Sequence, residues 1–237
     1  MRKEVMLATL GLRAGYGGKP VLQGLDLEVR EGEIVAVIGR NGVGKSTLMK
    51  SLIGLIPATD GSIVYKGTAV ERLAAHRRAR LGVGYVPQGR DVFPRLTVGE
   101  NIAVGGMRAG GVSAADRERV LGYFPILRER WNQRAGTMSG GQQQQLAIGR
   151  VLVANPSLIL LDEPSEGIQP NIVQDIARIM VDLNRATGTT IVLVEQNIDM
   201  IRAMAQRCYV LDKGRIVAQL DREALADGEA MRRHLAV

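Results

Sequence analysis

Cysteine is nearly absent from this chain, since Cys208 is the only one in 237 residues. A single thiol cannot form an internal disulfide, which excludes the small disulfide-rich folds of secreted proteins. The first residues also lack the charged and then apolar pattern of a secretion signal. We therefore expect a protein that works in a reducing, cytosolic compartment.

Long apolar runs are missing as well. The longest stretch without a charged residue covers 135–149 and holds four consecutive glutamines. Such a segment cannot cross about 30 Å of hydrocarbon, so no membrane-spanning helix is expected. If the protein serves a membrane, it does so from the water side.

Aromatic residues make up 3% of the chain, which leaves little material for stacking on single-stranded nucleic acid. The net charge of +7 nevertheless keeps a nucleic-acid partner open as an alternative. One basic cluster stands out, and we predict that it is the solvated face of a helix. Its members are His76, Arg77, Arg78 and Arg80.

Glycine is abundant, with 29 residues or about 12% of the chain against a usual 7%. Tight turns, or close approach of the backbone to a ligand, are therefore expected. The 46% hydrophobic and 23% charged residues are ordinary for a globular protein. A length of 237 residues fits one domain that carries an insert.

Strand-like and helix-like segments alternate along most of the chain, which predicts an α/β fold with a mostly parallel sheet. An antiparallel β flank is expected at 5–12 and 25–29. Further strands are expected at 34–38, 62–65, 83–87, 158–161, 190–194, 208–211 and 215–220. No convincing strand occurs in 97–154. We interpret 1–237 as one domain with a helical sub-domain at about 97–154.

A glycine-rich segment at 39–46 matches the pattern G-x-x-x-x-G-K-[ST] between a buried strand and a helix. Its backbone N–H groups can form an anion-binding nest at the positive end of the helix. Lys45 is placed to meet the β- and γ-phosphates of a nucleotide, and Ser46 to bind Mg²⁺. The predicted nucleotide-binding residues are Gly39, Arg40, Asn41, Gly42, Val43, Gly44, Lys45, Ser46 and Thr47.

A second motif consists of four apolar residues followed by Asp162 and Glu163. It adds two carboxylates to the predicted phosphate site. A buried parallel strand delivers such carboxylates to its C-terminal end, where ligands bind in open α/β sheets. We predict that Asp162 holds Mg²⁺ and that Glu163 polarises the attacking water. A P-loop kinase would share the phosphate loop, but no acceptor site is recognisable.

The segment at 138–142, MSGGQ, resembles the L-S-G-G-Q signature of ATP-binding cassette (ABC) proteins, and the resemblance covers nearly the whole chain. It implies a P-loop NTPase core of the ABC type and a head-to-tail dimer with ATP at the interface. In that dimer Ser139, Gly140, Gly141 and Gln142 face the nucleotide of the other subunit. The resemblance also makes Gln88 a Mg²⁺ contact and Tyr16 the aromatic that stacks on adenine.

A closer likeness is to the shorter ATPase subunit of branched-chain amino acid and urea importers. It rests on the segments QGR at 88–90, FP at 93–94, LTV at 96–98, EN at 100–101, QQQQLAIGR at 142–150 and EGIQP at 166–170. The glutamine run and the EGIQP segment lean toward the branch that carries urea or short-chain amides.

Two positions depart from the common cassette pattern. Most cassette ATPases carry a switch histidine where this chain has Gln196, and many have aspartate where it has Gln169. Glutamine can hydrogen-bond to a phosphate or to Glu163, but it cannot become cationic. We therefore expect Gln196 as the second catalytic residue, and a heterodimer with a histidine-bearing ATPase, with a homodimer as the alternative.

The resemblance thus implies an ATP-hydrolysing subunit, with ATP and Mg²⁺ as cofactors, that energises an importer of branched-chain or hydrophobic amino acids, or of urea and short-chain amides. Its expected partners are a second ABC ATPase, transmembrane permease subunits and, indirectly, a periplasmic or extracellular solute-binding protein. Its expected place is the cytoplasmic face of the membrane, without nucleic acid. The alternative is a soluble ABC ATPase that acts on nucleic acid or ribosomes.

Overall fold

The computed structural model describes residues 3–107 and 110–226. Its larger sheet has six strands in the order β10-β9-β3-β8-β7-β6, and the pairs from β9 to β6 are parallel. The strands are β3 (Ile34–Ile38), β6 (Val83–Val86), β7 (Leu158–Asp162), β8 (Thr190–Val194), β9 (Arg207–Asp212) and β10 (Arg215–Leu220). A hairpin joins β9 to β10, which pairs antiparallel at the edge.

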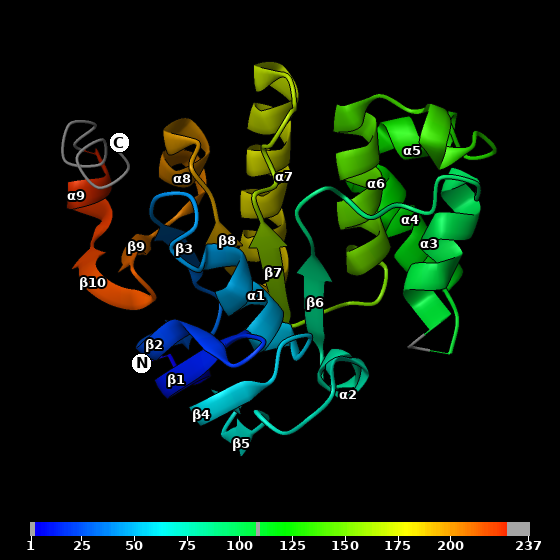
Figure 1. Ribbon diagram of the computed structural model, residues 1–237. Coiled ribbons are helices and arrows are strands. Elements are labelled where there is room, and N and C mark those ends of the chain that lie inside the picture. The colour runs from blue at the N-terminus through cyan, green and yellow to red at the C-terminus, as the bar shows by residue number, and fades with distance from the viewer. Residues whose placement is uncertain (1–2, 108–109, 227–237) are drawn as a thin grey trace.

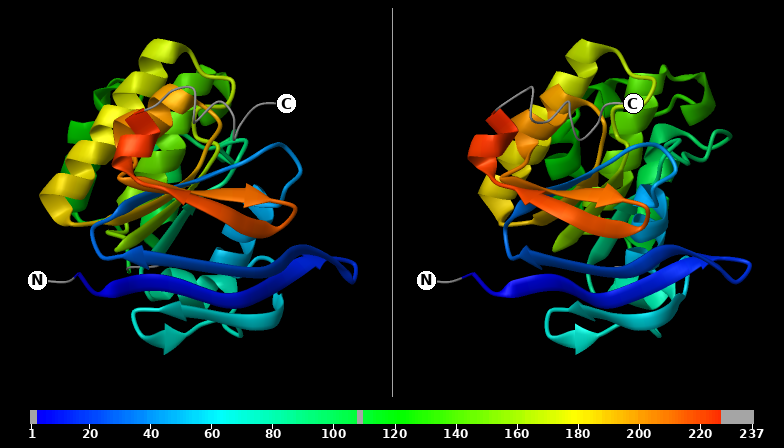
Figure 2. Two further views of the ribbon diagram at one scale, coloured as in Figure 1. Left: turned by 90° about the vertical axis from the view of Figure 1, so that its left-hand side faces the viewer. Right: turned by 60° about the vertical axis from the view of Figure 1, so that its left-hand side comes forward.

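A second, antiparallel sheet has the order β2-β1-β4-β5 and lies below the first in Figure 2. Its strands are β1 (Val5–Tyr16), β2 (Lys19–Arg30), β4 (Ala58–Tyr65) and β5 (Thr68–Ala69). Helix α1 (Lys45–Ile53) packs between the two sheets (Figure 1). The predicted α/β class with an antiparallel flank is confirmed.

Both faces of the parallel sheet are covered, which explains why its strands are continuous apolar runs. In β3, Val35 and Val37 join the core against α1 and the antiparallel sheet, whereas Ile34, Ala36 and Ile38 join the core on the opposite face. That opposite face is covered by α7 (Pro170–Thr187), α8 (Ile198–Met204) and α9 (Arg222–Ala226) (Figure 1).

The segment between β6 and β7 is helical and lies to one side of the sheet (Figure 1). Its helices are α3 (Val98–Gly106), α4 (Ala114–Tyr123), α5 (Pro125–Glu129), the 3-10 turn η2 (Ala135–Thr137) and α6 (Gly140–Leu152). Capping boxes begin α3 at Thr97 and α6 at Ser139, where each hydroxyl accepts from the backbone three residues on. In the described part of 97–154 no strand forms. The division into core and sub-domain stays a prediction.

The two long strands of the antiparallel flank extend further than their apolar patterns predict. The register between β1 and β2 shifts near Gly11, which has a φ of 58°, and β2 contains Gly24 with a φ of 85°. These positive angles suit glycine, and the irregularities interrupt the alternation that marks a strand in sequence. Pairing therefore continues through segments that resemble loops.

The structure corrects the predicted solvated face at 76–80. Helix α2 (Ala75–Arg80) exposes His76, Arg77 and Arg80, but the Arg78 side chain is 1% exposed. Its guanidinium donates to carbonyl oxygens of Ser51, Leu52, Glu71 and Leu73 at 2.7–3.0 Å. Burial lowers the pKa of this guanidinium, yet an arginine remains charged at neutral pH. Arg78 therefore satisfies carbonyl groups in the last turn of α1.

We expect Arg78→Met to lower the free energy of unfolding by about 3 kcal/mol, because it leaves several buried carbonyl groups without donors. Urea denaturation followed by circular dichroism measures the change. The matched control is Arg77→Met, an exposed neighbour on the same helix, which should stay within about 0.5 kcal/mol of the wild type. Equal losses for both variants would contradict this role of Arg78.

Candidate functional site

A pocket of about 390 Å³ lies at the C-terminal ends of the central strands, where the loop 39–44 joins β3 to α1. Two glycines show why this loop is rich in glycine. A Cβ at Gly39 would meet the carbonyl oxygen of Leu211 at 2.2 Å, and Gly44 caps α1 with a φ of 112°. The lining residues are Tyr16, Val21, Asn41, Gly42, Gly44, Lys45, Ser46, Thr47, Gln88 and Glu163.

Lys45 lies at the first turn of α1 and is 4% exposed. Its Nζ donates to the carbonyl oxygens of Gly39 at 2.9 Å and Arg40 at 3.0 Å, and lies 3.5 Å from Oε1 of Glu163. A buried ammonium that is held by loop carbonyls and a carboxylate can transfer these contacts to phosphate oxygens.

Asp162 ends β7 and is 1% exposed, beside the hydroxyls of Ser46 and Tyr85. Ser46 Oγ donates to one carboxylate oxygen at 3.1 Å, and the Tyr85 hydroxyl donates to the other at 3.2 Å. Burial raises the pKa of the Asp162 carboxyl, while these two hydrogen bonds oppose the shift. Tyr85 was not among the residues predicted from the sequence, although β6 lies beside β7 and a polar residue near the end of β6 was a usable signal.

Glu163 follows directly and is held by amide groups from two other loops. Gln196 Nε2 donates to its Oε1 at 2.9 Å, and Gln88 Nε2 donates to its Oε2 at 3.3 Å. Glu163 has a φ of 47°, and its backbone N–H donates to Val194 at 2.9 Å. Gln196, predicted to stand in place of the switch histidine, thus contacts the carboxylate predicted to act on water.

Glu166 and Glu195 were also not among the site residues predicted from the sequence. Gln88 Nε2 donates to Glu166 Oε2 at 3.1 Å, so one glutamine joins both carboxylates of this loop. Glu195 is 2% exposed, and its carboxylate accepts from the backbone N–H groups of Ser165, Gln196 and Asn197 at 2.6–3.1 Å. Glu195 therefore fixes the loops that carry Glu163 and Gln196.

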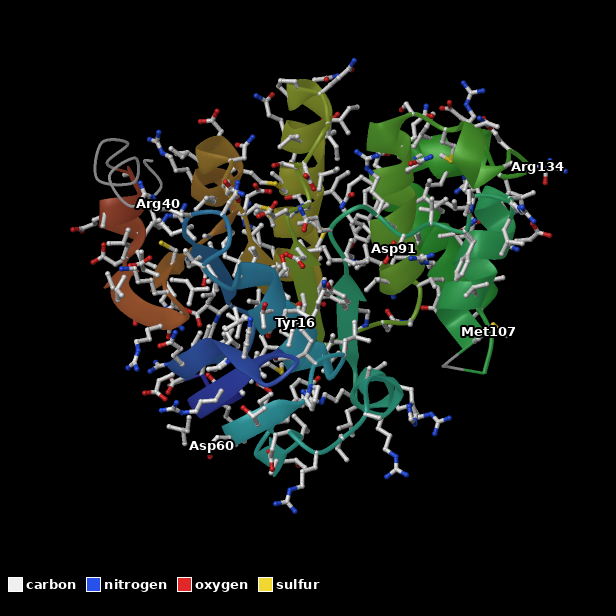
Figure 3. The ribbon with its side chains drawn as sticks, viewed as in Figure 1. Tyr16, Arg40, Asp60, Asp91, Met107 and Arg134 are labelled. Carbon is white, nitrogen blue, oxygen red and sulfur yellow. The ribbon has the colours of Figure 1, made fainter. Side chains whose placement is uncertain are left out.

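The remaining predicted residues occupy different places. Figure 3 shows Tyr16 beside α1 at the end of the β1–β2 hairpin, and its side chain is 52% exposed. Arg40 lies on the phosphate loop (Figure 3), and Val43, in the same loop, is 9% exposed. Neither of these two lines the pocket, although the carbonyl of Arg40 accepts from Lys45.

The signature residues lie outside this pocket, at the start of α6. Ser139 caps the helix, and its backbone N–H donates to Oε1 of Gln142 at 3.1 Å. A Cβ at Gly140 would lie 3.0 Å from the Arg90 guanidinium, and a Cβ at Gly141 would lie 3.0 Å from Ile172. The chain therefore brings the phosphate loop, Asp162, Glu163, Gln88 and Gln196 together, but not the signature.

Comparison with known proteins decides the family. A model of the family described as ABC transporter matches residues 22–166. The chain belongs to the ABC transporter family. The family and the fold predicted from the sequence are confirmed, and with them the prediction of an ATPase.

Among the relatives of this ABC protein is the high-affinity branched-chain amino acid transport ATP-binding protein BraG of Pseudomonas aeruginosa. It is 49% identical over 203 residues, which cover 85% of this chain and 87% of BraG. The probable branched-chain amino acid transport ATP-binding protein LivF of Archaeoglobus fulgidus is 36% identical over 89% of this chain and 90% of its own length.

A solved structure of another ATP-binding cassette shows that protein as a dimer in a post-hydrolysis state bound to ADP and Pi. It superposes with a TM-score of 0.82 at 26% identity, over 92% of this chain and 99% of its own. ABC ATPases of this fold therefore bind the adenine nucleotides expected here and dimerise. The comparisons do not favour the nucleic-acid alternative. No helix in the described part of this ABC protein has both the length and the apolar character of a membrane span.

Proposed function

We propose that this ABC ATPase energises a membrane importer of branched-chain or hydrophobic amino acids. The observation that carries the proposal is that Lys45 and Glu163 line one pocket, while Asp162 accepts from Ser46 and Gln196 donates to Glu163, two residues of that lining. The solute class is supported by the name of BraG, which matches most of the chain at 49% identity. Urea or short-chain amides remain the alternative solutes, on the glutamine run and the EGIQP segment.

Each group of the pocket takes one part in hydrolysis. The loop N–H groups and Lys45 hold the phosphates, with the Tyr16 ring beside the adenine. Ser46 and Asp162 offer hard oxygen ligands within 3.1 Å of each other, which suits Mg²⁺, and the Gln88 carbonyl is a third oxygen donor. Mg²⁺ held by these residues would neutralise phosphate charge. Glu163 accepts the proton of the attacking water, and Gln196 orients it.

The proposed assembly pairs this chain with a second ABC ATPase. Because the signature lies at the start of α6 and outside the chain's own pocket, the partner's nucleotide is its natural ligand. A partner that carries the switch histidine would complement Gln196, which cannot become cationic. We place the dimer on the cytoplasmic face of the membrane, where it acts on permease subunits and, through them, on a solute-binding protein.

A groove of about 300 Å³ lies between β6 and helices α3 and α6. We propose this groove as the site where a permease subunit binds. The Arg150 guanidinium lies 5.0 Å from the centroid of the Phe93 ring, which is 44% exposed. Arg150 Nη1 is buried and has no hydrogen-bond partner in the described part of the chain. We assign the groove to a permease segment that brings an acceptor oxygen, such as a carboxylate, to Arg150.

Uptake of labelled leucine and labelled urea by cells that lack this chain tests the function. Leucine uptake should fall below about a tenth of the wild-type rate and return with the wild-type chain but not with Glu163→Gln. Loss of urea uptake alone would select the alternative solute. Unchanged uptake of both would contradict an importer.

The same uptake assay tests whether a permease segment binds in the groove. Arg150→Met should reduce leucine uptake at least about fivefold, because the buried permease acceptor loses its donor. Arg130→Met removes an exposed charge outside the groove and should leave uptake within about twofold. Equal uptake by the two variants would contradict docking at Arg150.

A further inference from the structure

Gln196 makes two hydrogen bonds through one nitrogen atom. Its Nε2 donates to Oδ1 of Asn41 at 2.7 Å and to Oε1 of Glu163 at 2.9 Å. The three residues follow three neighbouring strands, because β8 lies between β3 and β7 in the sheet. A side chain at the end of β8 can therefore reach the loops that leave both neighbours.

These two bonds fix the direction of the Gln196 amide. A primary amide has two N–H donors and one carbonyl acceptor, so both donors are used by Asn41 and Glu163. The carbonyl Oε1 is then the only hydrogen-bonding atom of the amide that remains for a ligand. With the bond to Glu163 alone, the amide could rotate about that contact and present either end to the pocket.

We propose that the Asn41 side chain is a positioning residue for ATP hydrolysis, which holds Gln196 so that its Oε1 accepts a hydrogen bond from the attacking water. Glu163 then takes the proton while Gln196 keeps the water in line with the γ-phosphate. The proposal rests on the proposed ATPase function and adds to it an acceptor that replaces the switch histidine. The Asn41 side chain thereby has a role in hydrolysis, in addition to the phosphate-binding role of the loop backbone.

A packing role does not account for Asn41. Asn41 and Gln196 are both exposed, and Asn41 lies on a loop rather than in either apolar core. Asn41→Ala should therefore leave the melting temperature within about 2 °C of the wild type. An effect on turnover without an effect on stability is what positioning predicts.

The kinetic test is a double-mutant cycle on the full chain with its partner ATPase. Asn41→Ala should lower kcat about tenfold, because water orientation contributes to the transition state, and should change the KM for ATP less than about twofold. In a Gln196→Ala background the same substitution should cost less than about twofold further. Asn171→Ala, an exposed asparagine on α7, is the matched control and should change neither constant.

Additive losses in the cycle, or a rise in KM at constant kcat, would overturn the proposal. A second measurement reads the geometry without activity, through the side-chain amide signals of ¹⁵N-labelled glutamine, with Gln196 assigned by its loss in Gln196→Ala. Asn41→Ala should shift one hydrogen of the Gln196 pair more than the other. Unchanged Gln196 signals would also overturn it. A wild type that hydrolyses no ATP would count against the proposed function, while the amide signals still decide the role of Asn41.

Discussion

Glu163→Gln is expected to lower kcat for ATP hydrolysis by about two to three orders of magnitude while ATP still binds. The substitution keeps the size of the side chain but removes the carboxylate that accepts the proton of the attacking water. Lys45, 3.5 Å from Oε1, retains its carbonyl contacts with Gly39 and Arg40. Because ATP then persists in the site, the ATP-bound dimer should accumulate. Phosphate release and size-exclusion chromatography measure the two effects.

The control for this variant is Asp175→Asn, which changes an exposed carboxylate on α7 that pairs with Arg178. A surface pair of this kind contributes little, so kcat should stay within about twofold. If Glu163→Gln kept more than about a tenth of the wild-type rate, the proton acceptor would be another group. If the variant kept ATP without forming a dimer, the proposal that two subunits share each nucleotide site would be wrong.

Lys45→Met is expected to raise the Kd for ATP by about 10–100-fold. The ammonium is 4% exposed at the first turn of α1, where its charge-assisted hydrogen bonds to phosphate are little weakened by solvent. Methionine keeps the aliphatic length and loses only the charge and the donors. Isothermal titration or a fluorescent ATP analogue measures the affinity, with circular dichroism to confirm that the variant folds.

Lys66→Met is the matched control, because it removes an exposed lysine far from the phosphate loop in sequence and outside the pocket. Its Kd for ATP should stay within about twofold of the wild type. Equal loss of affinity in the two variants would point to overall charge rather than to a direct phosphate contact. Unchanged affinity in Lys45→Met would remove the phosphate loop from the binding site.

The phosphate loop, Asp162 and Glu163 could be predicted because each belongs to a short sequence motif. The spacing of the glycines, the apolar run before Asp162 and the position of Lys45 at a helix start all refer to neighbours in the chain. The strands at 34–38, 190–194 and 215–220 were predicted to the residue, since each is a short run bounded by turn residues or a change of polarity.

Arg78 shows where this reasoning fails. In the sequence, Arg78 is one of several basic residues at 76–80 and cannot be told from its neighbours. In the structure its side chain is 1% exposed and contacts carbonyl groups of α1 and of the segment before α2. Burial of one member of a charged run depends on which face of a short helix meets another element, and six residues give too little periodicity to reveal it.

By itself, the sequence predicted the fold class from the alternation of strand-like and helix-like segments, and it predicted the phosphate loop and the acidic strand end from local patterns with a local physical cause. The signature was predicted from its resemblance to the ABC family. The tertiary structure alone decided that Gln196 meets Asn41 and Glu163, that Tyr85 donates to Asp162, and that the signature lies apart from the chain's own pocket. These contacts join residues far apart in sequence, and they depend on which strands become neighbours in the sheet. Strand order is set by the burial of whole faces, which no short segment encodes.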